Sequence, residues 1–152
     1  MDVKDRQIIR ELQRDGRLSN HELAERVNLS PSPCLRRLRN LEKSGVIQGY
    51  TALIDQKAYG LPVTVFIRIR LEHHSRQAVE IFEDSIARID EILDCYLMTG
   101  DCDYLLRVIV ESLEVYENFI REKIHKIPSI ASIDTSFAYG VVKQTRVFAN
   151  RP

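Results

Sequence analysis

Hydrophobic residues recur at helical spacing in three successive segments of the first fifty residues. The segments cover residues 2–14, 19–27 and 30–43, and polar or charged residues separate the apolar ones. Spacings of three and four residues place the apolar side chains on one face of a helix. The positions on these faces are Ile8, Ile9, Leu12, Leu23, Ala24, Val27, Leu35, Leu38 and Leu41. The pattern therefore predicts three short amphipathic helices.

Capping and turn residues mark where these helices begin. Ser19, with Glu22 three residues later, has the spacing of a capping box, in which each side chain accepts from a backbone N–H of the first turn. Asn28 tolerates a positive φ and suits a tight turn. Ser30 followed by Pro31 predicts a hydroxyl cap and a proline at the first position of the third helix. Two helices, a tight turn and a third helix predict a helix-turn-helix.

The periodicity changes beyond residue 45. Residues 46–51 predict a short strand, which makes the helix-turn-helix a winged one, and residues 51–62 have no clear period and resemble a linker. Alternating polarity predicts strands over 63–72, 93–98, 104–111 and 133–139, and helical spacing predicts helices over 75–89 and 113–126. The order β-α-β-β-α-β predicts a ferredoxin-like sandwich. We therefore expect an α+β chain with a winged helix-turn-helix at 1–50, a linker at 51–62 and a βαββαβ domain at 63–152.

One face of the predicted sheet has no helix to cover it. Phe66, Tyr96, Met98 and Ile109 lie opposite the helix side of their strands. An apolar face of this size on a monomer needs a partner. We therefore expect a homodimer, which would also present two DNA-binding heads to a pseudo-palindromic site.

The distribution of charge favours DNA binding by the third helix. The whole chain is neutral, but residues 1–50 hold ten basic and seven acidic side chains, a charge of +3, which leaves −3 for the rest. The outward face of the third helix combines arginines with polar side chains, opposite its leucines, as a recognition helix for the major groove requires. Its N-terminal end also presents amides and a positive dipole to phosphates. We expect DNA contacts from Ser19, Asn20, Ser30, Ser32, Pro33, Arg36, Arg37, Arg39, Asn40 and Lys43.

Other classes of function fit the sequence less well. A solvated charged face on a helical protein–protein adaptor would not need the arginines of the third helix. A thiol enzyme would need a histidine near a cysteine, and Cys34 lies among the leucines, where it is expected to be a small buried hydrophobe. A metal site from His73 and His74 is disfavoured because adjacent residues of a strand point to opposite faces. We expect no enzymatic activity, metal or cofactor.

Three further features concern the cellular location. The three cysteines are an odd number without a scaffold pattern, which fits a reducing compartment. The first residues contain no apolar signal core, and no apolar run approaches the roughly 18 residues that span a bilayer. We therefore expect a cytoplasmic protein without a membrane partner.

Four segments of the chain resemble one known family. Residues 16–23 (GRLSNHEL), 29–37 (LSPSPCLRR), 45–52 (GVIQGYTA) and 99–106 (TGDCDYLL) are similar to the leucine-responsive regulator/AsnC family of prokaryotic transcription factors. The resemblance covers nearly the whole chain. It implies a winged helix-turn-helix joined to a ligand-sensing domain, an amino-acid effector, and dimers that assemble into octamers or other higher oligomers.

The resemblance also implies where the effector binds. In the family, the effector lies in crevices between dimers, lined by the hairpin loop and nearby residues. Carried over by position, this implies Leu97, Thr99, Gly100, Asp101, Asp103 and Tyr104, with weaker indications for Leu113, His125, Phe137 and Ala138. Asp101 or Asp103 can accept from an ammonium group, and a loop containing Gly100 exposes amides to a carboxylate. Cys102 stands where the family often has an aromatic residue.

Overall fold

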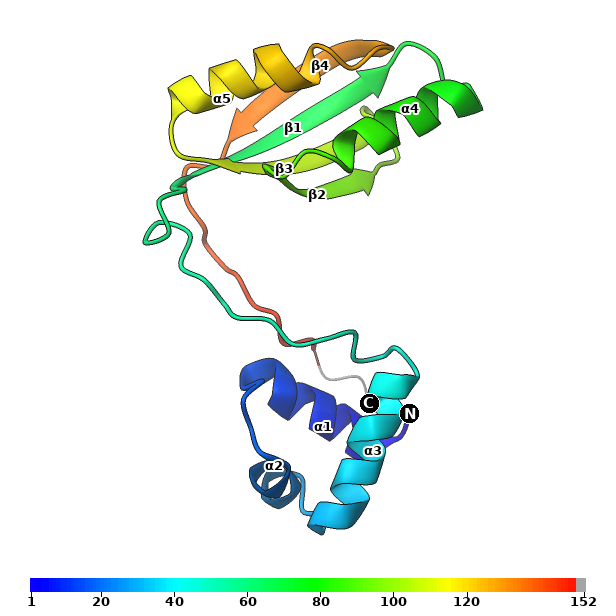
Figure 1. Ribbon diagram of the computed structural model, residues 1–152, viewed down its shortest axis with the longest axis vertical. Helices are drawn as coiled ribbons and strands as arrows, with labels where there is room; N and C mark the ends of the chain where they lie inside the picture. Colours follow the sequence, from blue (N-terminus) through cyan, green and yellow to red (C-terminus); the bar gives the residue numbers. More distant parts are fainter. Residues whose placement is uncertain (150–152) are drawn as a thin grey trace. The chain divides into compact units, whose positions relative to one another are not determined.

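The computed structural model describes residues 1–149 and divides the chain into two compact units (Figure 1). Of the described residues, the first unit contains Met1–Leu53 and residues 142–149, and the second contains Ile54–Val141. The sequence had suggested one uninterrupted second domain over 63–152. The structure instead groups the described residues after Val141 with the first unit, and residues 150–152 of that predicted domain lie outside the described residues.

The first unit is a bundle of three helices: α1 (Val3–Arg14), α2 (Asn20–Arg26) and α3 (Pro31–Lys43). The predicted helical faces meet in its core, which consists of Ile8, Leu23, Ala24, Val27, Cys34 and Leu41. Leu35 and Leu38 of the predicted stripe are only partly buried. Cys34 is fully buried, as expected for a small hydrophobe.

The predicted capping box, the turn at Asn28 and the proline at the first position of α3 are confirmed. The Ser19 hydroxyl accepts from the Glu22 amide, the Glu22 carboxylate accepts from the Ser19 amide, and Asn28 adopts a φ of 52°. The hydroxyl cap predicted at Ser30 is wrong, although Ser30 is the N-cap residue of α3. A capping hydroxyl bonds the amide of the second or third helical residue, and the third here is Pro33, which has no N–H.

The strand predicted over residues 46–51 does not form, because no described segment pairs with it. The segment is held against α3 by other contacts. The Ile47 amide donates to the Leu41 carbonyl, its side chain packs on the core of the first unit, and the Tyr50 hydroxyl donates to Glu42 over 2.9 Å. Burial and the Glu42 carboxylate raise the pKa of Tyr50 to about 12. These contacts fix where the chain leaves α3.

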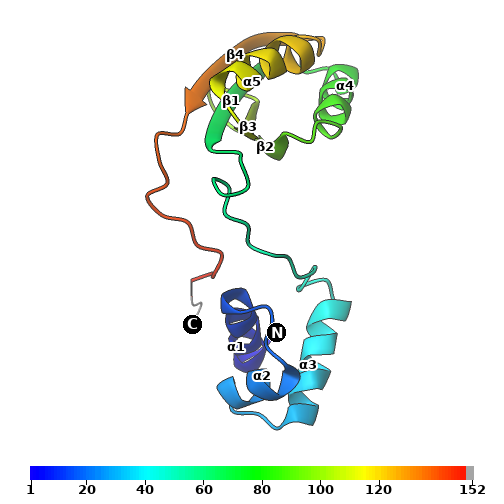
Figure 2. The same ribbon diagram turned by 60° about the vertical axis from the view of Figure 1, so that its left-hand side comes forward.

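The second unit has the predicted βαββαβ order. Its strands are β1 (Val63–Leu71), β2 (Ile92–Leu97), β3 (Tyr104–Val110) and β4 (Ile130–Phe137), and its helices include α4 (Arg76–Ile86) and α5 (Leu113–Phe119). The sheet order is β2-β3-β1-β4, and all neighbouring pairs are antiparallel. Both helices cover one face of the sheet (Figures 1 and 2). The expected ferredoxin-like topology is confirmed.

The core of the second unit lies between the sheet and its helices. Alternate residues of β1 and β3 point into it, so that Val65, Ile67 and Ile69 are fully buried beside Phe82 from α4. On the opposite face, Phe66 and Ile109 are half-buried and Tyr96 is 54% exposed. Met98 is 38% exposed, and the same face also carries the ion pairs Arg68–Asp134 and Arg107–Asp94, so the predicted apolar face is present only as a mixed one.

The helix predicted over 113–126 changes its winding. α5 ends at Phe119 and continues as a π-helical turn, η1 (Ile120–Ile124), in which the His125 amide donates to the Ile120 carbonyl. Turns of this kind are rare, and they re-aim the residues that follow. Within residues 1–149, no helix is long and apolar enough to cross a membrane.

Candidate nucleic-acid interface and effector site

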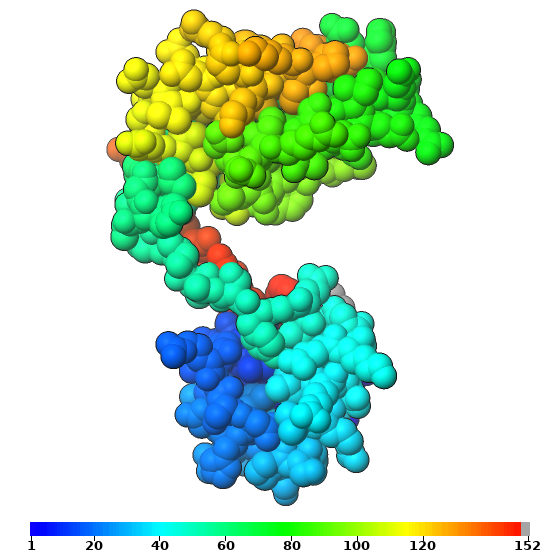
Figure 3. Space-filling model, in the orientation of Figure 1, coloured from blue at the N-terminus to red at the C-terminus, as the bar shows by residue number. Residues whose placement is uncertain are grey.

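The outward face of α3 is the candidate nucleic-acid interface. Six of the predicted residues are exposed on it or just before it: Ser30, Ser32, Arg36, Arg39, Asn40 and Lys43. Pro33 is half-buried. The helix lies open on the surface of the first unit, as its cyan atoms show in Figure 3. Among residues 1–149, none pairs with the guanidinium of Arg36 or Arg39, so both are available to a ligand.

Arg37 is placed differently from the other two arginines. Its Nη1 donates to Asp2 Oδ2 over 2.7 Å and to Asp5 Oδ1 over 2.8 Å, and the side chain is 32% exposed. The hydrogen bonds that Arg37 donates to Asp2 and Asp5 raise the pKa of Arg37. The Asp5 amide and the Arg37 guanidinium in turn lower the pKa of Asp2. Arg37 therefore ties α3 to the start of α1, a role that its position in the sequence did not indicate.

Ser19 and Asn20 also have structural roles. The Ser19 hydroxyl caps α2, and Asn20 Nδ2 donates to the Pro31 carbonyl over 2.9 Å. This bond joins the first residue of α2 to the first residue of α3, so it sets the geometry of the turn between the two helices. Neither side chain is freely available in the way that Arg36 is.

The start of α3 offers fewer amides than an ordinary helix. Pro31 and Pro33 have no N–H, and the Cys34 amide donates to the Ser30 carbonyl. Only the Ser32 amide of the first turn is left to bind an anion. The exposed hydroxyl of Ser30, which does not cap the helix, is a further donor at this end. The expected phosphate contact here thus depends on serine side chains more than on backbone amides.

The candidate effector site centres on the hairpin between β2 and β3. Thr99, Gly100 and Asp101 are exposed, and Gly100 has a φ of 109°, which a residue with a side chain rarely adopts. Among residues 1–149, none bonds the Asp101 carboxylate. The hairpin therefore presents one free carboxylate beside a glycine.

Asp103 fastens this hairpin to the end of β1. Its Oδ2 accepts from the Leu71 amide over 2.7 Å, and its Oδ1 lies 2.8 Å from His74 Nε2. Its amide donates to the Ile69 carbonyl, and its carbonyl accepts from the Met98 amide. The Leu71 amide and then His74 lower the pKa of Asp103. Both carboxylate oxygens are already used within the chain, unlike those of Asp101.

Leu97 and Tyr104 face each other across β2 and β3 but differ in exposure. Leu97 is 75% exposed, whereas Tyr104 is 2% exposed. The Tyr104 ring packs on the Phe82 ring in a tilted arrangement, with 4.5 Å between the ring centroids, and its hydroxyl donates to Glu83 over 2.8 Å. Burial and this bond raise the pKa of Tyr104 well above its usual value. Its side chain therefore belongs to the core, and Leu97 is the accessible member of the pair.

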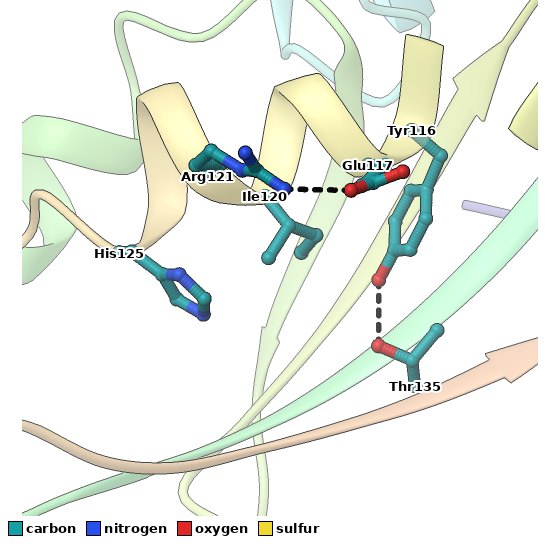
Figure 4. A pocket seen from close by; sticks show the side chains of 6 residues that line it. All are labelled: Tyr116, Glu117, Ile120, Arg121, His125 and Thr135. Atoms are coloured by element: carbon teal, nitrogen blue, oxygen red, sulfur yellow. Dashed lines mark hydrogen bonds and ion pairs between the residues drawn. The ribbon is translucent and has the colours of Figure 1, made fainter. Parts of the chain in front are cut away.

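Two of the weaker candidates, His125 and Phe137, lie at a separate pocket beside α5 and η1. Tyr116, Glu117, Ile120, Arg121, His125 and Thr135 line its volume of about 250 Å³ (Figure 4). The Tyr116 hydroxyl lies 2.6 Å from the Thr135 hydroxyl, and Phe137 packs edge-on against the Tyr116 ring. Of the six lining residues, the sequence indicated only His125 as a site candidate, and the other five were missed. The four-residue spacing of Glu117 and Arg121 was the one available signal for them.

The described residues support neither a metal site nor a nucleophilic thiol. Within residues 1–149, no three His, Cys, Asp or Glu side chains are grouped closely enough to hold a metal ion. Burial and then Glu83 raise the pKa of Cys95 to about 11, and burial raises that of Cys34. Both thiols are therefore protonated at neutral pH and poor nucleophiles.

Comparisons with known proteins identify a family model for each of the two units. The family model described as Winged helix-turn-helix DNA-binding matches residues 1–48, and the model described as Lrp/AsnC ligand binding domain matches residues 64–148. The leucine-responsive regulatory protein of Escherichia coli is 40% identical over 145 residues, which cover 95% of this chain and 88% of that protein. That of Klebsiella pneumoniae matches equally well.

Solved structures are similar over nearly the whole chain. A transcriptional regulator of Neisseria meningitidis in complex with L-methionine has a TM-score of 0.93 and 35% identity, over 98% of this chain and 96% of that one. An AsnC family transcriptional regulator from Agrobacterium tumefaciens has a TM-score of 0.93 and 38% identity, over 98% and 97% of the two chains. The similarity therefore extends to fold and sequence together.

Proposed function

The chain belongs to the Lrp/AsnC family of transcriptional regulators, and we propose that its α3 helix reads DNA while its β2–β3 hairpin binds an amino acid. As a member of this family it is a DNA-binding regulator with an amino-acid ligand-binding domain. Its relatives are regulators and not enzymes. Which residues contact DNA and effector is the proposal developed here.

We propose that Arg36 and Arg39 contact the DNA, with Lys43 and the hydroxyls of Ser30 and Ser32 adding contacts along the same face. The observation that supports this most strongly is that Arg36 and Arg39 are exposed and have no partner among residues 1–149. Arg37 supports DNA binding indirectly, because its guanidinium holds α3 against the start of α1 through the carboxylates of Asp2 and Asp5. Asn40 lies on the same exposed face and can hydrogen-bond to bases.

The test uses a DNA duplex selected by the protein from random sequences. Affinity is measured by fluorescence anisotropy over a range of salt concentrations for the wild type and for Arg36→Ala, Arg39→Ala and Arg76→Ala. Each phosphate contact that is lost lowers the salt slope by about 1. Arg76 is 92% exposed in the second unit and controls for the loss of one positive charge. Unchanged affinity and slope in both α3 variants would show that another surface binds DNA.

We propose that the effector is an amino acid whose ammonium group bonds Asp101 and whose carboxylate meets the amides around Gly100. Leu97 offers an exposed apolar surface to its side chain. The similar Neisseria regulator was solved with L-methionine, and the similar enterobacterial proteins are named for leucine. Both amino acids are therefore the first to test by calorimetry, on the wild type and on Asp101→Ala. Binding that is equal in the two proteins would overturn the role of Asp101.

We propose further that the protein works in the cytoplasm as a homodimer that assembles into octamers. The exposed sheet face around Tyr96, with Phe66 and Ile109, supports a twofold contact, because such a face gains most from being covered by its own copy. Light scattering across a concentration series tests this directly. A mass equal to the 17.6 kDa monomer at all concentrations would contradict it.

A further inference from the structure

The chain's own C-terminal segment lies on α1 of the first unit. Gln13, in the last turn of α1, donates from Nε2 to the Arg146 carbonyl over 2.8 Å, and its Oε1 accepts from the Phe148 amide over 3.1 Å. The partners are more than 130 residues apart in sequence. One side-chain amide therefore binds both polar groups on one side of the backbone around Val147.

This arrangement has the hydrogen-bond pattern of strand pairing. In a parallel sheet, one residue bonds a carbonyl and the amide two residues further along its neighbour. The Gln13 amide supplies the same donor and acceptor from a helix. Recognition through the backbone alone depends little on the side chains of the bound segment, as in peptides that add to a sheet edge. The Phe148 side chain accordingly stays 77% exposed, while Val147 is half-buried.

A cavity of about 610 Å³ runs along the same surface of the first unit. It is lined by Met1, Arg6, Ile9, Arg10, Gln13 and Val46 and, from the C-terminal segment, by Phe148 and Ala149. The segment thus forms one wall of a hollow whose other walls come from α1 and from the chain after α3. The surface of α1 opposite the core is therefore partly covered by the C-terminal segment and lines a cavity.

The C-terminal segment that contacts α1 is also one of the two connections between the units. The backbone passes between the two units twice, once at Leu53–Ile54 and once at Val141–Val142. The second passage follows β4, and the eight residues 138–145 separate the end of β4 at Phe137 from the contact with α1 at Arg146. We propose that residues 144–149 form a strap that binds α1 through the Gln13 amide and couples the amino-acid-binding unit to the DNA-binding unit. The coupling rests on the proposed function, whereas the binding of the strap does not.

The strap is tested in the full chain with Gln13→Ala and the matched control Gln7→Ala. Gln7 lies on the same helix, is exposed, and has no partner among residues 1–149. NMR measures the exchange rate of the Phe148 amide hydrogen with water. Loss of two solvent-exposed hydrogen bonds should speed this exchange about tenfold in Gln13→Ala and leave it unchanged in Gln7→Ala. Trypsin cleavage after Arg146 should accelerate relative to cleavage after Lys143, which serves as the internal reference. Equal exchange in the three proteins would overturn the strap.

The coupling is tested by the effect of L-methionine and of L-leucine on the affinity for the selected DNA duplex. Wherever the wild type responds, Gln13→Ala should respond several-fold less, and Gln7→Ala should respond like the wild type. A full response in Gln13→Ala, despite faster exchange at Phe148, would show that the strap binds without coupling the units. If the wild type itself does not respond to any amino acid, the proposed effector function fails and the coupling with it, while the exchange measurement still decides whether the strap binds.

Discussion

Replacing Asp103 by alanine tests whether a carboxylate in the β2–β3 hairpin stabilises the fold or serves only to bind the effector. A carboxylate that only binds effector is dispensable for folding. Asp103, however, accepts from the Leu71 amide over 2.7 Å and contacts His74 over 2.8 Å, and Leu71 is 5% exposed. Asp101 has no such partner among residues 1–149. The two aspartates should therefore respond differently to the same substitution.

The magnitude follows from the bonds that are lost. A hydrogen bond to a charged acceptor contributes about 1.5–3 kcal/mol, and its loss leaves the amide of the buried Leu71 without a partner. The pair with His74 is exposed on the histidine side and adds less than about 1 kcal/mol. We expect Asp103→Ala to destabilise the second unit by roughly 2 kcal/mol. Asp101→Ala should stay within about 0.5 kcal/mol of the wild type.

The assay is urea unfolding of the full chain, followed by the near-ultraviolet circular dichroism of tyrosines. Tyr104 and Tyr116 are buried in the second unit, so their signal reports on that unit. Asp103→Asn keeps an acceptor for the Leu71 amide without the charge and should fall between the wild type and Asp103→Ala. Equal midpoints for the Asp101 and Asp103 alanine variants would refute the assignment of Asp103 as the residue that fastens the hairpin.

Three further outcomes follow from the same structure. The pKa of Asp103 is lowered in the folded state, so its carboxylate stabilises the fold above the ordinary pKa of 3.8, and this stabilisation is lost as the pH falls through the lowered pKa. The difference in unfolding free energy between wild type and Asp103→Ala should therefore narrow on acidification below about pH 4. Ser19→Ala should destabilise the first unit by about 1 kcal/mol in thermal unfolding and Ser30→Ala should not, since only Ser19 caps its helix; equal effects would contradict this. Phe82→Ala should cost about 3–5 kcal/mol in the urea assay, and a cost below about 1 kcal/mol would mean that its ring is not packed on Tyr104.

The elements of this fold follow from local patterns and were largely predictable. The two-residue spacing of the aliphatic Val65, Ile67 and Ile69 predicted β1 and its buried face, and the pair Ser19 and Glu22 predicted the start of α2. Such patterns act over a few residues and are visible in one sequence. The failed cap at Ser30 was partly visible, since Pro33 removes one of the two amides that a capping hydroxyl can bond.

The roles of individual polar residues were less predictable, because distant partners decide them. Arg37 has the same sequence context as Arg36, but only the fold brings Asp2 and Asp5 to its guanidinium. Asp103 differs from Asp101 through Leu71 and His74, which lie about 30 residues earlier. Gln13 meets Arg146 and Phe148 from the other end of the chain. Spacing in the sequence contains no signal for contacts of this range.

The central claim, that amino-acid binding and DNA binding are coupled in one chain, is tested most directly by measuring the coupling from both sides. DNA affinity is measured with and without saturating L-methionine or L-leucine, and the affinity for that amino acid is measured with and without saturating DNA. Thermodynamic linkage requires the two ratios to be equal, and allosteric coupling is typically about 5–150-fold. The account predicts equal ratios different from one for at least one amino acid. An amino acid that binds with a ratio of one in both directions, with no other amino acid showing coupling, would contradict it.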